Sequence, residues 1–318
     1  MKIFSGIQPT GRKHLGNYIG AIRQYVEGQD RGDPAVFCIV DLHAITVAYD
    51  PGELRERLYD TTAILLASGL DPGRCILFRQ SDVHEHTELA WLLGAVCAHG
   101  DLNRMHQFKD KSAAQRELVS AGLFSYPVLQ AADVLAYRAD EVPVGEDQRQ
   151  HIELMREIAR RFNERFGQTL TVPDHRIPEI GAKVMDLQEP ERKMSTTVGA
   201  DSGRVYVLDE EKAIRKKFGS AVTDSGREIL RGEDKAGVSN LIGIYSVARG
   251  VSGDEVEAEF EGKGYGDFKK AVAEAVVDLL APVREAYPDI RSDEAELERL
   301  LAEGAGRARE IAADTLAD

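Results

Sequence analysis

The residues whose types and spacing could best support chemistry lie close together near the N-terminus, within residues 5–18. Hydrophobic patterning and turn residues predict a buried strand over residues 3–7, a turn over 9–11 and a helix over 17–26. The start of such a helix presents unpaired backbone N–H groups and a partial positive charge, which favour a bound anion. Gly11 and Gly16 let a ligand approach the backbone, and His14 adds a donor that protonation can switch. The stretch therefore has the geometry of a phosphate-binding site.

The glycine spacing narrows the kind of phosphate site. The dinucleotide-binding fingerprint and the P-loop both require glycines at intervals that residues 5–18 lack. A strand, a glycine turn and a helix also occur together for packing alone. The remainder of the chain must therefore decide between a packing role and a nucleotide site.

Composition limits the class of protein. The 318 residues are 43% hydrophobic, enough for one large or two ordinary globular domains. A formal net charge of -14 argues against a protein that coats itself with nucleic acid, although it leaves room for a local basic patch. No apolar run reaches membrane-spanning length and the chain begins with a strand pattern, so we expect a cytoplasmic protein with no membrane partner. The three cysteines form no Cys-x-x-Cys pair and indicate neither a zinc site nor a disulfide framework.

Strands and helices alternate through the first half of the chain. After the first strand, we expect strands over residues 35–40 and 75–78 and helices over 53–70 and 83–99. This alternation predicts an α/β fold with a doubly wound parallel sheet, in which ligands bind at the carboxyl ends of the strands. Gln8 and His43 both follow such strand ends. By position alone, His43 fits a structural histidine as well as a functional one.

Asp133 lies in unusually apolar surroundings. It falls within the run from Val128 to Ala136, where burying an unpaired carboxylate costs free energy. A donor must therefore face it, and a helix cap, a salt bridge or a ligand would each serve.

A possible metal motif precedes this run. His84, Glu85, His86 and Glu88 are close in sequence, but alternate helical positions face different directions and helical zinc ligands usually lie four residues apart. We therefore predict no structural metal.

Several motifs, in order along the chain, resemble those of one family. His14-Leu15-Gly16-Asn17 resembles the first signature of class I aminoacyl-tRNA synthetases, which has the form His-Ile-Gly-His. The lead-in Gly6-Ile7-Gln8-Pro9-Thr10-Gly11 is similar to the bacterial tryptophanyl-tRNA synthetases, in which asparagine also ends that signature. Lys193-Met194-Ser195 matches the start of the second signature, Lys-Met-Ser-Lys-Ser. The resemblance spans nearly the whole chain.

This resemblance implies ATP-dependent ligation of L-tryptophan to its tRNA, through a tryptophanyl-adenylate, with ATP and Mg²⁺ entering together and a homodimer as the assembly. It assigns catalysis to His14, Asn17, Lys111, Lys193 and Ser195. It assigns the ATP site to Gln8, Pro9, Thr10, Gly16, Asn17, Gly145, Glu146, Asp147, Val184, Lys193, Met194, Ser195, Thr196 and Thr197. It assigns the tryptophan pocket to Phe4, Gly6, His43, Tyr126, Gln130, Asp133, Val142, Val144 and Gln148, with Asp133 accepting the indole N–H.

Some positions depart from the family pattern. Thr196 stands in place of the second signature lysine, which normally helps to hold pyrophosphate, and Thr197 replaces the final serine. Gln130 stands where the bacterial enzymes usually have methionine, and Gln-x-x-Asp is reminiscent of tyrosyl enzymes. Two alternatives therefore stay open: tyrosine as the substrate, and a synthetase-like paralogue that binds tryptophan and ATP as a sensor or accessory protein.

The resemblance also implies two domains. Residues 1–185 would form a Rossmann-like catalytic domain that holds the tryptophan and ATP sites. Residues 186–318 would begin with a mobile signature loop over 186–200 and continue as a smaller, all-helical anticodon-binding domain. Apolar residues from 265 onward follow a helical spacing, as that arrangement requires.

Overall fold

A computed structural model of the chain describes residues 2–105, 119–145, 148–176, 183–196 and 198–318. Its strands are β1 (Ile3–Ile7), β2 (Ala35–Ile39), β3 (Ile76–Arg79), β4 (Glu141–Pro143) and β5 (Asp174–Arg176). They form a five-stranded sheet in the order β3-β2-β1-β4-β5, and each neighbouring pair is parallel. In this order the chain winds outward from β1 in both directions, which confirms the predicted doubly wound sheet. Its switch point lies between β1 and β4.

The helices of the first half are α1 (Leu15–Asn17), the π-helix η1 (Tyr18–Ile22), α2 (Arg23–Asp30), α3 (Asp41–Ala44), α4 (Pro51–Ala67), the 3₁₀-helix η2 (Gln80–Asp82), α5 (Glu85–Gly94), α6 (His99–Asn103) and α8 (Ala121–Leu135). Those of the second half are α9 (Arg149–Phe166), the 3₁₀-helix η4 (Asp201–Gly203), α10 (Glu211–Gly219), α11 (Ala236–Arg249), α12 (Gly253–Glu259), α13 (Tyr265–Ser292) and α14 (Glu294–Ala317). The predicted strand and helix order is confirmed, although the helix expected over residues 17–26 begins earlier and contains a π-helical turn.

Local sequence explains where several of these elements begin. Every residue of β2 is buried, as its unbroken apolar run requires for a central parallel strand. At the start of α4, the Asp50 carboxylate accepts a hydrogen bond from the Glu53 amide at 2.8 Å, and Pro51 occupies the first helical turn. Ser120 caps α8 in the same way, accepting from the Leu123 amide at 3.0 Å. The second of these caps fixes the start of α8, which carries part of the site described below.

Contacts divide the chain into two compact units. The first unit takes Met1–Thr10, Tyr25–Ile177 and Arg291–Asp318, and the second takes Gly11–Gln24 and Pro178–Ile290. The sheet belongs to the first unit, and the second is helical apart from isolated bridges among its described residues. These units do not coincide with residues 1–185 and 186–318, which remain a prediction for the functional domains.

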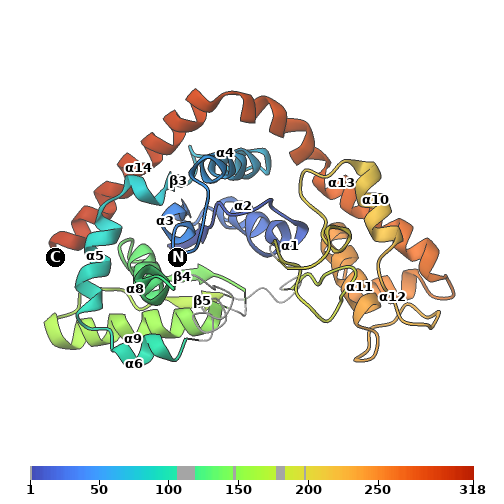
Figure 1. Ribbon diagram of the computed structural model, residues 1–318, viewed down its shortest axis with the longest axis horizontal. Coiled ribbons are helices and arrows are strands. Elements are labelled where there is room, and N and C mark those ends of the chain that lie inside the picture. The colour runs from blue at the N-terminus through green and yellow to red at the C-terminus, as the bar shows by residue number, and fades with distance from the viewer. Residues whose placement is uncertain (1, 106–118, 146–147, 177–182, 197) are drawn as a thin grey trace. The chain divides into compact units, whose positions relative to one another are not determined.

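The last helix belongs to the first unit and covers the edge of the sheet. Figure 1 shows α14, in red, beside β3 and α5, and contacts join it to both. Gly304 makes this approach possible, because a Cβ atom there would overlap the carbonyl oxygen of Leu77 in β3. Ala305, Ala308 and Ala312 of the same helix join the apolar cluster of the sheet. The edge strand is therefore shielded from other chains.

Candidate active site

A buried carboxylate in the first unit receives hydrogen bonds from several elements. Asp133 is only 2% exposed, and its Oδ1 accepts from Gln80 Nε2 at 2.7 Å. His86 Nδ1 lies 2.6 Å from the same oxygen, and His43 Nε2 lies 2.7 Å from Oδ2. Behind His86, its Nε2 lies 2.6 Å from the Tyr137 hydroxyl. We call Asp133, His43, Gln80, His86 and Tyr137 the Asp133 network.

These contacts keep the carboxylate ionised. Burial by itself would raise the pKa of Asp133, but the electrostatic attraction and hydrogen bonds of His43 and His86 outweigh it and hold the pKa well below its usual range. A carboxylate can accept about four hydrogen bonds. Three of them come from the network, so Oδ2 retains capacity for a further donor. The donors that face Asp133 are thus, in the first place, side chains of the protein itself.

The other α8 residues that are assigned to the tryptophan pocket lie on the same face of the helix as Asp133. The Tyr126 ring meets the His43 ring edge-on at 6.2 Å, and its hydroxyl lies 2.7 Å from His151 Nε2. Gln130 Nε2 donates to Gln148 Oε1 at 3.3 Å, which joins α8 to the residue that precedes α9. The structure therefore brings His43, Tyr126 and Asp133 together, and Gln130 with Gln148.

The remaining residues that are assigned to the tryptophan pocket lie in the sheet or directly after one of its strands. Phe4 stacks on Tyr137 with ring centroids 5.4 Å apart, and it packs in the same apolar cluster as Val142 and Val144. A side chain at Gly6 would meet Val40 Cγ1 at 2.9 Å, so β1 has no room for one there. These residues share an apolar cluster, and their contact with tryptophan stays a prediction.

The second unit holds the predicted phosphate-binding helix start. His14 and Asn17 form a reciprocal cap: Asn17 Oδ1 accepts from the His14 amide at 3.1 Å, and His14 Nδ1 accepts from the Asn17 amide at 3.3 Å. Since Nδ1 is an acceptor, the proton of a neutral imidazole must lie on Nε2. A neutral His14 therefore offers an N–H donor from Nε2.

The second signature lies against this helix start, within the same unit. The Met194 amide donates to the Val184 carbonyl at 3.0 Å, and Met185 and Lys193 form an antiparallel bridge. A Cβ atom on Gly16 would lie 3.6 Å from Val184 Cβ. One on Gly11 would lie 3.1 Å from Thr196 Cβ, so Gly11 is a position of close approach, whereas Gly16 is in ordinary contact distance of Val184. Two segments far apart in sequence are thereby brought together.

Cations surround His14 in this unit. Burial first, and then the positive charges of Lys13, Lys193 and Arg204, lower the pKa of His14 to about 4. At neutral pH the imidazole is therefore uncharged while its neighbours are cationic. Such a group of donors suits an anionic ligand, because the field is positive and the histidine can donate without a charge of its own.

Arg204 contributes to the site although the sequence did not single it out. Its guanidinium donates to the Thr196 carbonyl at 3.0 Å and also to the Gly199 carbonyl. It therefore holds the backbone of the segment that follows Ser195 and brings a positive charge near His14. Sequence spacing offered no signal for it, because the residue lies outside both signatures.

Some predicted residues are only partly located or lie outside the described residues. Gln8, Pro9 and Thr10 follow β1 in the first unit, and Gly145 follows β4 by two residues. Lys111, Glu146, Asp147 and Thr197 lie outside the described residues. Their predicted roles stay predictions.

The sequence also missed three members of the Asp133 network, namely Gln80, His86 and Tyr137. The sequence suggested His86 only as part of a metal motif that its spacing argues against, and its complete burial beside Asp133 is seen only in the fold. In the described residues, no group of three His, Cys, Asp or Glu side chains could hold a metal ion.

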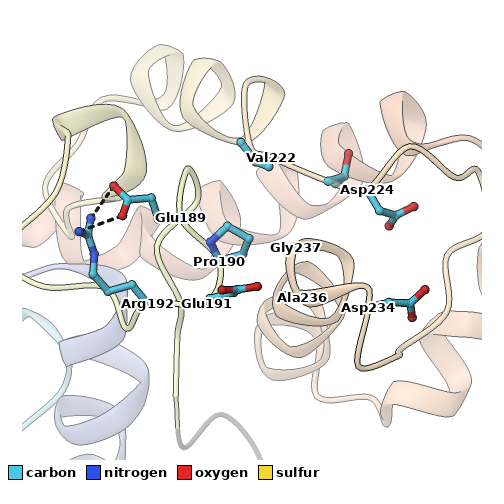
Figure 2. A pocket seen from close by; sticks show the side chains of 10 residues that line it. Glu189, Pro190, Glu191, Arg192, Val222, Asp224, Asp234, Ala236 and Gly237 are labelled. Atoms are coloured by element: carbon cyan, nitrogen blue, oxygen red, sulfur yellow. Dashed lines mark hydrogen bonds and ion pairs between the residues drawn. The ribbon is translucent and has the colours of Figure 1, made fainter.

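A separate pocket of about 570 Å³ lies in the second unit (Figure 2). Its lining consists of Glu189, Pro190, Glu191, Arg192, Val222, Thr223, Asp224, Asp234, Ala236 and Gly237. Figure 2 shows Arg192 paired with Glu189, at 3.0 Å. The other charged groups of the lining are carboxylates, which would repel the phosphates of a nucleotide. This pocket is therefore not assigned to ATP.

Comparisons with known proteins give one consistent result. A family model described as tRNA synthetases class I (W and Y) matches residues 1–281. A tryptophan–tRNA ligase from Wolinella succinogenes is 48% identical over 314 residues, which cover 99% of this chain and 95% of that protein. Tryptophan–tRNA ligase 2 from Streptomyces avermitilis is 52% identical over 318 residues, which cover 99% and 94%.

Solved structures agree with these sequence relatives. A tryptophanyl-tRNA synthetase from Mycoplasma pneumoniae superposes with a TM-score of 0.93 at 34% identity, covering 99% of this chain and 95% of that one. The Campylobacter jejuni enzyme complexed with ADP and tryptophan gives a TM-score of 0.81 at 34% identity, covering 99% and 97%.

Proposed function

The chain belongs to the class I tRNA synthetases of the tryptophan and tyrosine type, and from this premise we propose that it is a tryptophan–tRNA ligase. It activates L-tryptophan with ATP to give tryptophanyl-adenylate and pyrophosphate, and then transfers the tryptophanyl group to tRNA with release of AMP. The observation that carries this proposal is the sequence match to tryptophan–tRNA ligases. About half of the aligned residues are identical, and the alignments cover nearly the whole of both chains. The location that we propose for this reaction is the cytoplasm.

Amino-acid binding is the role we propose for the residues around Asp133. The ionised carboxylate accepts the indole N–H on the Oδ2 side, while Phe4 and Val142 provide apolar contacts. A site that hydrogen-bonds a substrate donor rejects analogues without it by about 10⁴- to 10⁵-fold, because the acceptor is left unpaired. An analogue of tryptophan without the ring N–H is therefore expected to be a poor substrate.

ATP binding is the role we propose for the residues around His14. Activation is an in-line displacement at the α-phosphate by a carboxylate that is already ionised, so the protein needs no general base for this step. It needs donors that stabilise negative charge as pyrophosphate leaves. Neutral His14, the backbone amide of Gly16 and the Lys193 ammonium supply them.

Magnesium enters, in this proposal, as the ATP complex and not as a resident metal. Mg²⁺ usually keeps several waters and binds through substrate phosphates together with one or two carboxylates. The metal would neutralise phosphate charge, and the side chains named above would orient the nucleotide.

A homodimer is the assembly we propose. Trp91 in α5 is 83% exposed, and its neighbour Leu92 is 45% exposed, which is unusual for large apolar side chains on one short helix. Trp91 is also the one tryptophan of the chain. Its fluorescence therefore reports on this surface: we expect a blue shift at concentrations where sedimentation shows dimers, and no shift on dimerisation would contradict this interface.

The experiment that tests the activity measures pyrophosphate exchange with tryptophan and with tyrosine, followed by charging of transcribed tRNA. We expect exchange that depends on tryptophan and full charging of the tryptophan tRNA. Exchange driven by tyrosine would overturn the substrate assignment. Exchange without charging would instead favour a tryptophan sensor or accessory protein.

A further inference from the structure

The Asp133 network contains a chain of hydrogen bonds whose direction can be deduced. Burial raises the pKa of Tyr137, so its hydroxyl keeps its proton and can donate. An ionised carboxylate only accepts, so His86 Nδ1 carries a proton and donates to Asp133 Oδ1 at 2.6 Å. The other ring nitrogen, Nε2, lies 2.6 Å from the Tyr137 hydroxyl. Tyr137 thereby holds the far side of the imidazole that donates to the carboxylate.

Gln80 has a fixed direction for a similar reason. Its Oε1 accepts from the Leu42 amide at 3.1 Å, which orients the amide group so that Nε2 donates to Asp133 Oδ1. On this oxygen, His86 and Gln80 are both donors. The carboxylate therefore has no hydrogen-bonding advantage in taking up a proton on Oδ1.

Packing prevents His86 from leaving this position. The side chain is completely buried, its ring meets Phe78 edge-on at 5.6 Å, and it meets Tyr137 at 5.4 Å. The Tyr137 ring is in turn stacked against Phe4. Rings packed at both ends hold the imidazole in one orientation.

From this geometry we infer that His86 is a positioning residue for substrate selection: oriented by Tyr137, it keeps Asp133 an acceptor, so that the pocket requires an amino acid whose side chain brings a hydrogen-bond donor. The inference rests on the proposed function, because it assumes that the ligand of this pocket is the amino acid. His86 itself acts on Asp133 and need not touch the substrate.

Loss of the His86 donor should change the protonation of the carboxylate. The ionisable groups around Asp133 are His43 from α3, His86 from α5, Tyr137 after α8 and the Cys38 thiol of β2, whose pKa is raised by burial and then by the Asp133 charge. With one donor removed, the pKa of Asp133 rises, because fewer hydrogen bonds favour its charged form. A protonated carboxyl can donate, and the requirement for a substrate N–H weakens.

The test compares His86→Leu with His86→Asn. Leucine removes both ring nitrogens, whereas the asparagine amide can still donate from a position close to that of Nδ1. The readout is the ratio of kcat/KM for tryptophan to that for 3-(benzothiophen-3-yl)alanine, which lacks the N–H, in pyrophosphate exchange. We expect this ratio to fall about 10- to 100-fold in His86→Leu, the range for a lost hydrogen bond to a charged group, and to be largely retained in His86→Asn.

The pH profile separates positioning from a merely structural effect. Between about pH 7.5 and about pH 5.5, KM for tryptophan should be flat in the wild type but should rise toward acid in His86→Leu. KM for ATP should stay unchanged in His86→Leu and in His86→Asn. An unaltered selectivity ratio with a flat profile in His86→Leu would overturn the inference.

A milder variant covers the case in which His86→Leu does not fold. Tyr137→Phe keeps the ring that stacks on Phe4 and removes only the hydroxyl that contacts His86 Nε2. We expect its ratio to fall by up to about 10-fold, with circular dichroism unchanged. No change in the ratio would count against the inference. If the wild type itself shows no tryptophan-dependent exchange, the proposed function fails instead, so the two failures are distinguishable.

Discussion

Asp133 in the first unit and His14 in the second are both buried ionisable side chains, but their surroundings favour opposite charge states. Hydrogen bonds from His43, His86 and Gln80 keep Asp133 negative in spite of its burial. Around His14 the neighbours are cations, and with burial they keep the imidazole neutral. One region thus stabilises a buried charge, and the other prevents one from forming.

The difference follows the ligand that each region would bind. A neutral indole N–H gains most from a full negative charge, since hydrogen bonds to ionised acceptors are about twice as strong as neutral ones. A polyphosphate already carries the charge, so cations and neutral donors suffice. A protonated His14 would also lose the Nδ1 acceptor that caps Asn17.

The largest effect on stability and activity should come from a substitution in the Asp133 network. Asp133→Asn removes the charge and places an amide against donors from His43, His86 and Gln80. Removing one partner of a buried ionic network costs about 3–5 kcal/mol, so we expect the free energy of unfolding to fall by that order and KM for tryptophan to rise. Denaturant unfolding and pyrophosphate exchange measure the two effects.

Asp50→Asn is the matched control for that substitution. Asp50 is an exposed helix cap, and asparagine caps a helix about as well as aspartate does. A loss of activity in the control as large as that of Asp133→Asn would show that the effect is not specific to the network.

The next effect concerns the charge of the second region. Lys193→Ala should lower kcat for exchange by about 10²- to 10³-fold, the range for losing one preorganised donor, with KM for tryptophan little changed. Exposed Lys212 on α10 provides the control, and Lys212→Ala should leave kcat unaltered. A larger effect on KM for tryptophan than on kcat would contradict the assignment of Lys193 to ATP.

The protonation of His14 can be tested through stability. Its pKa is lowered from 6.5 to about 4 on folding, so between these values the unfolded state binds the proton more readily and stability declines as pH falls. This penalty is absent above about pH 6.5 and reaches up to about 3 kcal/mol near pH 4. Unfolding of the wild type and of His14→Gln across this range should differ in slope, and parallel curves would refute the low pKa.

The smallest effect should come from a substitution of Arg204 that removes its positive charge. Arg204→Gln keeps a donor for the Thr196 carbonyl but removes the positive charge, so adenylate formation in single-turnover experiments should slow by about 10-fold. Tryptophan binding should be unaffected. Exposed Arg227 is the control, and an equal loss in Arg227→Gln would mean that overall charge, not position, matters.

Sequence reasoning located the residues that carry their own local signal. His14, Gly16 and Lys193 belong to ordered motifs, and the structure brings these motifs together within one unit. Asp133 was recognisable because a carboxylate in an apolar run needs a donor. The identity of that donor was not predictable, because His86 and Gln80 reach Asp133 only through tertiary packing of α5 and η2 against α8.

The fold shows the same division. Apolar runs and their alternation with helical segments predicted the parallel sheet, since burial on both faces leaves a clear pattern in each strand. The helical character of the C-terminal region was predicted as well. Its packing partner was not, because a helix stripe shows that a face is buried but not against which element, and α14 packs on β3.

This return of α14 to β3 has a consequence for biosynthesis. The edge strand β3 leaves the ribosome long before α14, so this edge of the sheet stays uncovered while the residues between them are made. Contacts between such distant segments slow folding, and the unprotected strand edge can pair with other nascent chains in the meantime. A chaperone that holds the emerging sheet would therefore act mainly before α14 appears.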